Sequence, residues 1–181
     1  FKDGFSTGHG VLREPNDISS YSALACIAIQ SNQNDQHGGQ SIVNFDYGLA
    51  PGVKKTYKKR YFRLLRNALE LLGGEHTDKD VDDIRETLKG EGLEPELDTN
   101  PVYDEREKQL LLDRGYDEKE IDKVIEFTKR KAAEETDKAT YQAMEAFIHN
   151  LNTMHSRAGA QTPFSSINYG MDTSTEGRMV M

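Results

Sequence analysis

The sequence predicts an α/β fold that is rich in helices and has a few short strands. Apolar residues recur at three- and four-residue steps over long stretches, which is the periodicity of helices. Two short segments, residues 41–45 and 163–169, have the composition or the alternation of strands. The order of strand, helix pair, strand and helix indicates an α/β framework that is interrupted by a helical excursion.

The first predicted segment, residues 1–52, contains a helix and a strand. Asn16 or Asp17 can cap a helix that we expect over residues 18–34. The apolar positions of this helix cover more than one narrow stripe, so we expect it to be well buried. Glycines 38–39 end the helix, and the first predicted strand follows them.

The second predicted segment, residues 53–154, consists mostly of long helices. Apolar residues keep a helical spacing from Val53 to Leu72, and a glycine pair follows. Residues 75–137 contain 22 of the 31 acidic residues of the chain. Capping residues within this acidic stretch predict two short helices and one long helix, which begin near Thr77, Asp104 and Asp117.

The third predicted segment, residues 155–181, contains the second strand and the start of a further helix. Thr173 and Glu176 have the spacing of a capping box that begins this helix. The sequence begins at Phe1 without an initiator methionine and stops within the predicted helix. We therefore expect it to be an internal piece of a larger protein.

Composition restricts the function. The net charge of −8 argues against nonspecific binding of nucleic acid by the whole chain, although one nucleotide can still bind at a local basic site. No apolar run reaches the roughly 18 residues that span a membrane. Cys26 is the single cysteine, which favours a reducing compartment and rules out an internal disulfide or a cluster of cysteines around zinc.

A basic run on the first long helix is the clearest candidate binding feature. Lys55, Lys59, Arg63 and Arg66 share one helical face by their spacing. Such a face can hold a triphosphate through charge-assisted hydrogen bonds. The alternatives are a solvated face or ion pairs with the acidic stretch, and the sequence leaves these open.

Other reactive residues have plainer interpretations. Cys26 lies inside a helical pattern between Ala25 and Ile27, where a buried small side chain is expected, and no residue of the chain is predicted to be catalytic. His37 and His155 are read as residues of a helix end and a turn rather than as acids or ligands.

Two stretches resemble a known family, the anaerobic, class III ribonucleotide reductases. One runs from Pro15 to Gly39 and includes the motif Asn-Gln-Asn-Asp-Gln-His-Gly-Gly. The other covers residues 152–170 and includes Gly-Ala-Gln-Thr-Pro-Phe. The similarity is weak over residues 75–119, where we expect variable length.

The resemblance implies the fold and the reaction of the intact protein. The fold is a ten-stranded α/β barrel that holds a glycyl radical. A thiyl radical abstracts the 3′ hydrogen of a ribonucleoside triphosphate, the 2′ hydroxyl leaves, and formate or a thiol system is the reductant. The glycyl radical, a zinc site and an ATP-binding regulatory region are expected outside this chain, which alone should be inactive. A homodimer, a radical-SAM activating enzyme as partner and a cytoplasmic location are also implied.

The resemblance also implies binding residues. A dNTP specificity effector is expected at the dimer interface, against the basic helix of segment 53–154. By position, the phosphate partner is Lys59, the flanking residues are Arg13 and Asn16, and the candidate for reading the base is Gln30.

Gln161 and Ser165 are candidates for the substrate end of the barrel, although they can equally satisfy the edges of strands. Two other interpretations of the whole chain remain. The long helices could form an interaction module without a ligand, or the chain could be an unrelated acidic helical domain.

Overall fold

The computed structural model describes the chain except for residues 1–4, 7–10, 37, 74–75, 156–161 and 163. The chain divides into two compact units. Residues 1–56 and 137–181 form the first unit, and residues 57–136 form the second. The first unit is therefore built from two segments that lie far apart in the sequence.

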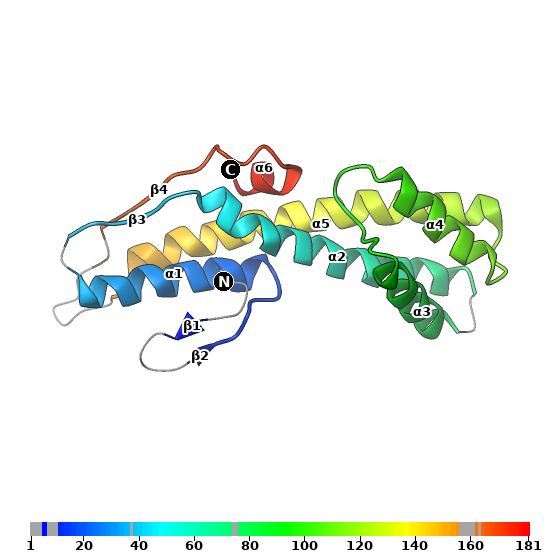
Figure 1. Cartoon of the computed structure of the whole chain (residues 1–181), viewed down its shortest axis with the longest axis horizontal. Coiled ribbons are helices and arrows are strands. Elements are labelled where there is room, and N and C mark those ends of the chain that lie inside the picture. The colour runs from blue at the N-terminus through cyan, green and yellow to red at the C-terminus, as the bar shows by residue number, and fades with distance from the viewer. Residues whose placement is uncertain (1–4, 7–10, 37, 74–75, 156–161, 163) are drawn as a thin grey trace. The chain divides into compact units, whose positions relative to one another are not determined.

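The described elements are labelled in Figure 1, and most of the described residues are helical. In chain order they are β1 (Phe5–Ser6), β2 (Val11–Leu12), α1 (Ile18–Asp35), β3 (Gln40–Ile42), α2 (Phe45–Leu71), α3 (Thr77–Gly90), α4 (Pro101–Leu112), α5 (Glu118–Thr153), β4 (Ser165–Ile167) and α6 (Thr175–Val180). The prediction of a helix-rich chain with a few strands is confirmed. No helix in the described part of the chain is long and apolar enough to span a membrane.

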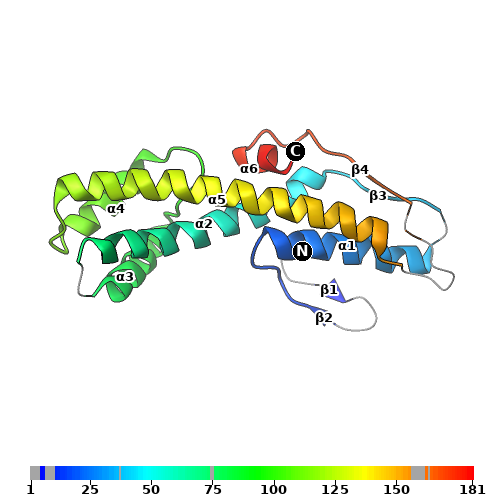
Figure 2. The same ribbon diagram turned by 180° about the vertical axis from the view of Figure 1, so that it is seen from behind.

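Helix α1 confirms the first predicted helix. Asp17 is its N-cap and accepts a hydrogen bond of 2.9 Å from the backbone N–H of Ser20. Helix α1 packs against the C-terminal part of α5, and the two helices run parallel, as Figure 2 shows. Small side chains allow this close approach, because the Ser22 hydroxyl donates directly to the backbone oxygen of Ala143 at 2.8 Å.

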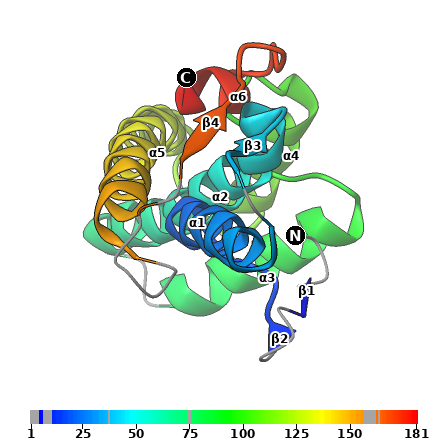
Figure 3. The same cartoon turned by 90° about the vertical axis from the view of Figure 1, so that its left-hand side faces the viewer.

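Strands β3 and β4 form a parallel pair, and they lie side by side in Figures 1 and 3. Gln40 is opposite Ser165, and Ile42 is opposite Ile167. Each strand has three residues and is shorter than predicted. Strands β1 and β2 form an antiparallel pair that the sequence analysis did not predict.

Helix α2 begins eight residues earlier than predicted, at Phe45 rather than at Val53. Pro51 lies inside the helix, where proline is ordinarily unfavourable because it lacks a backbone N–H. Gly52 has a packing role, because a β-carbon there would lie 2.8 Å from Cδ2 of Tyr21 on α1. The glycine therefore permits the close contact between α1 and α2.

The second unit has one core, to which α2, α3, α4 and α5 all contribute. Its large and fully buried side chains include Tyr61, Leu65, Leu69, Ile84, Leu88, Tyr103, Leu111 and Ile121. This is the arrangement expected of amphipathic helices that bury one face each.

Helix α3 begins at Thr77, as predicted, but the capping of three predicted helices needs correction. His76 is the N-cap of α3 and makes no capping hydrogen bond, so the predicted capping box at Thr77 is not formed. Helix α4 begins at Pro101 instead of Asp104, because Asn100 caps it and proline suits the first helical position. Ser174, rather than Thr173, caps α6.

Candidate functional site

The basic face of α2 was the strongest candidate site in the sequence. In the first unit, Lys55 forms an ion pair with Glu14, and its ammonium donates to the backbone oxygen of Pro15 at 3.0 Å. Lys55 thus contacts the two residues that separate Arg13 from Asn16. Both Arg13 and Asn16 are exposed.

In the second unit, the arginines of this face have carboxylate partners. Arg63 pairs with Glu135 of α5, and Arg66 pairs with Asp78 at 2.6 Å and with Asp82 at 3.0 Å. All three acids belong to the acidic stretch. The alternative interpretation, ion pairing with that stretch, is therefore confirmed for these two arginines.

Lys59, the predicted phosphate partner, is exposed on α2. Its neighbour Lys58 pairs with Glu94 of the α3–α4 connection. The Arg63–Glu135 pair is also partly exposed, with 47% of the Arg63 side chain accessible. Exposed pairs of this kind contribute only about 0.2–1 kcal/mol, so an anionic ligand can replace such a partner.

Gln30 lies on α1 and is half-buried. Its side-chain nitrogen Nε2 is buried and has no hydrogen-bond partner within the described residues. Ser165 is half-buried on β4, opposite Gln40. Gln161, like His37, lies outside the described residues.

Cys26 has the structural role expected from its sequence context. The side chain is 2% exposed, and its sulfur lies 3.7 Å from the backbone oxygen of Phe147. Burial raises the pKa of the Cys26 thiol to about 11, so little thiolate forms near neutral pH. His155 is exposed, as expected of a turn residue. Within the described residues, no cluster of His, Cys, Asp and Glu side chains could hold a metal ion.

A buried carboxyl group in the second unit was not predicted from the sequence. Glu107 of α4 is 0% exposed, and its two oxygens accept hydrogen bonds from Tyr61 at 2.5 Å and from Tyr103 at 3.0 Å. Burial raises the pKa of Glu107 to about 7, although the two tyrosine hydrogen bonds oppose this rise. The available signal was its position, four residues after Tyr103 and three before Leu110, on the apolar face of α4.

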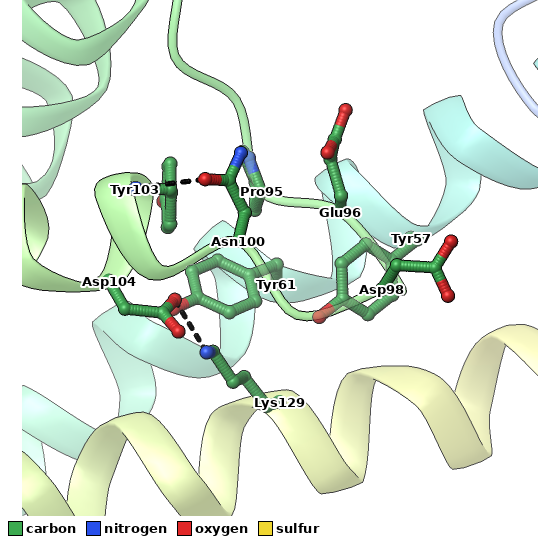
Figure 4. A pocket seen from close by; sticks show the side chains of 9 residues that line it. All are labelled: Tyr57, Tyr61, Pro95, Glu96, Asp98, Asn100, Tyr103, Asp104 and Lys129. Atoms are coloured by element: carbon green, nitrogen blue, oxygen red, sulfur yellow. Dashed lines mark hydrogen bonds and ion pairs between the residues drawn. The ribbon is translucent and has the colours of Figure 1, made fainter.

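Figure 4 shows a recess that is lined by Tyr61 and Tyr103, the two hydrogen-bond donors of Glu107. Tyr57, Tyr61 and Tyr103 line it, and Lys129 of α5 pairs with Asp104 at 2.5 Å. The carboxylates of Glu96 and Asp98 also line the recess, but they point in different directions. The acidic groups therefore do not converge on one ligand atom.

One family model matches the whole chain, and two curated proteins match nearly all of it. The family model described as anaerobic ribonucleoside-triphosphate reductase matches residues 1–181. The anaerobic ribonucleoside-triphosphate reductase of Salmonella typhimurium is 24% identical over 177 residues, which is 98% of this chain and 17% of that protein. The protein of the same name from Enterobacteria phage T4 is 22% identical over 179 residues, 99% of this chain and 20% of its own length.

The chain thus spans about a fifth of the length of the curated relatives that it matches. The match of the family model includes both motif-bearing segments of the first unit and the acidic helical second unit. The chain belongs to the anaerobic ribonucleoside-triphosphate reductase family.

Proposed function

We propose that this chain is part of the catalytic subunit of an enzyme that converts ribonucleoside triphosphates to 2′-deoxyribonucleoside triphosphates by radical chemistry in the absence of oxygen. The match of the family model across residues 1–181 carries this proposal. The role of the chain is structural and regulatory, because its one cysteine is buried and mainly un-ionised. The radical glycine, the reactive cysteines and the zinc site would lie in other parts of the intact protein.

The β3–β4 pair supports a place in a larger sheet. Parallel strands are usually buried on both faces, yet this pair has only two short strands. Large apolar side chains beside it are exposed, with accessible fractions of 65% for Val43 and 83% for Phe164. Further strands of the proposed ten-stranded barrel would cover these side chains.

The exposed part of the basic face on α2 supports an effector site for a dNTP. Lys59 would bind the phosphates, and Arg63 would exchange its exposed carboxylate partner for them. Arg13, Asn16 and Gln30, which belong to the first unit, stay predictions from the resemblance. Because effector and substrate sites would be coupled, the bound dNTP would determine which ribonucleotide is reduced.

Exposed apolar residues on α5 support the proposed homodimer. Tyr141 and Ile148 lie seven residues apart on this helix, so they share one face, and their exposed fractions are 65% and 51%. Met144 lies between them on the same face. The alternative function, a helical dimerisation module that binds no ligand, rests on this same surface. A radical-SAM activating enzyme would be the second protein partner of the intact enzyme.

The first test is the thermal stability of the chain with and without dTTP, dGTP and dATP. At a ligand concentration of about 100 times Kd, binding stabilises the folded state by about 2.7 kcal/mol. For a chain of this size, this corresponds to a rise in Tm of about 5–10 °C. We expect the rise for particular dNTPs and its loss in Lys59→Ala.

Lys58→Ala is the matched control, because Lys58 is the adjacent cation on α2 and pairs with Glu94. A dNTP-dependent rise that persists in Lys59→Ala would contradict the assignment of Lys59. A dimer that shows no response to any dNTP, by sedimentation and by thermal stability, would favour the ligand-free module.

A further inference from the structure

The second unit contains an acidic group in an unusual setting. Glu107 is fully buried, and both of its oxygens accept hydrogen bonds from neutral phenols, Tyr61 of α2 and Tyr103 of α4. Hydrogen bonds from neutral donors compensate only part of the cost of burying a charge. The carboxyl group therefore gains less from ionisation here than it would in water.

The charged groups around Glu107 do not compensate for this reduced stabilisation of the ionised carboxylate. Lys129 of α5 is the cation that acts on it, and this ammonium is paired with Asp104 at 2.5 Å. The negative charge of Asp104 itself disfavours ionisation of Glu107. The other ionisable groups of the cluster are Tyr57 of α2 and, along the recess, Glu96 and Asp98 of the α3–α4 connection.

We propose that Glu107 is a proton-operated switch in the second unit, whose core is more stable when this buried carboxyl group carries a proton than when it is ionised. The switch acts where α2 and α4 meet, because the Tyr61–Glu107 hydrogen bond joins these two helices. Ionisation places a negative charge in a largely apolar and aromatic core.

The direction of the pH effect follows from the two states of Glu107. In the unfolded chain its pKa is near the ordinary value of 4.5, and in the folded unit burial raises the pKa to about 7. The contribution of Glu107 to stability is therefore complete below pH 4.5 and is lost as the pH rises through about 7. Above that pH both states are ionised, so no further change is expected from this group.

The test compares the unfolding equilibrium of the wild-type chain with that of Glu107→Gln between about pH 5 and about pH 8. Glutamine keeps the shape and can still bond to both hydroxyls, but it cannot titrate. We expect the unfolding equilibrium constant of the wild type to increase by about two orders of magnitude relative to that of the variant across this range. Glu105→Gln is the matched control, since Glu105 is an exposed glutamate on the same helix and its loss should leave the wild-type profile unchanged.

A second measurement needs no variant that might fail to fold. Infrared difference spectra of the wild-type chain during a pH titration should show the carbonyl band of a buried, protonated carboxyl group, which disappears near neutral pH. Glu105→Gln should keep this band. The proposal is wrong if the band is absent throughout the range, or if Glu107→Gln and the wild type have the same pH profile.

Discussion

The carboxylate of Asp46 accepts a hydrogen bond of 2.8 Å from the backbone N–H of Asp172, which lies 126 residues further along the chain. The same oxygen also accepts from the N–H groups of Gly170 and Met171 at 2.8 and 2.9 Å. These backbone hydrogen bonds, above all the one from Asp172, lower the pKa of Asp46 despite its complete burial. One carboxylate at the start of α2 therefore fixes the connection between β4 and α6.

Asp46→Asn should destabilise the first unit. The amide keeps one acceptor oxygen but loses the negative charge, so we expect a loss of about 1–3 kcal/mol in the free energy of unfolding. Because the folded pKa is lowered, the contribution of Asp46 is present above its ordinary pKa of 3.8 and is lost as the pH falls below it. Amide hydrogen exchange at residues 170–172 should accelerate in the variant, whereas Asp35→Asn, at an exposed acid of α1, should leave it unchanged.

Two glycines of α2 should respond in opposite ways to replacement by alanine. In Gly52→Ala the new methyl group would lie 2.8 Å from Cδ2 of Tyr21, so α1 and α2 must separate and stability should fall by about 1–3 kcal/mol. In Gly48→Ala the methyl group meets nothing within 4 Å, and the better helix propensity should stabilise by about 0.5–1 kcal/mol. Urea unfolding of both variants measures the difference, and equal effects would show that the α1–α2 contact is looser than described.

Tyr61→Phe should change the pH dependence of the second unit as well as its stability. The phenylalanine leaves one oxygen of Glu107 without its donor at 2.5 Å, which should cost about 1–3 kcal/mol when Glu107 is ionised. Since the Tyr61 hydrogen bond lowers the pKa of Glu107, its loss should raise that pKa further above 7. The titration of stability with pH should then move to higher pH, and a shift to lower pH would contradict the proposed hydrogen bond.

Cys26 should react slowly with alkylating reagents in the folded chain. The thiol is 2% exposed, and burial raises its pKa to about 11, so both access and thiolate are limited. In denaturant the thiol should react at the rate of an ordinary exposed cysteine. Mass spectrometry after timed alkylation measures both rates, and similar rates in the two conditions would show that α1 separates from α5 readily.

The features that could be predicted from the sequence are those set by local periodicity. Helices α1 and α5 were expected nearly at their observed bounds, because apolar spacing and the cap at Asp17 are local signals. The start of α2 was missed because Pro51 and Gly52 resemble a loop locally, while the packing of Tyr21 on Gly52 depends on another helix.

The candidate site shows the same limit. The sequence identified the basic face of α2 but left its partners open, since the pairing of Arg63 with Glu135 depends on how α2 and α5 pack. Glu107 was not singled out from the sequence, because its surroundings come from Tyr61, 46 residues away in the sequence. The local signal of its burial was its place on the apolar face of α4, four residues after Tyr103.

The pairing of β3 with β4 has a consequence for the order of folding. Gln40 must find Ser165 across a loop that contains the entire second unit, and such distant contacts form slowly because the closure of a long loop costs entropy. The contacts within residues 57–136 are closer in sequence, and this segment leaves the ribosome before β4 does. We therefore expect the second unit, residues 57–136, to acquire structure first during synthesis. Strand β3 would stay unpaired until β4 has been synthesised.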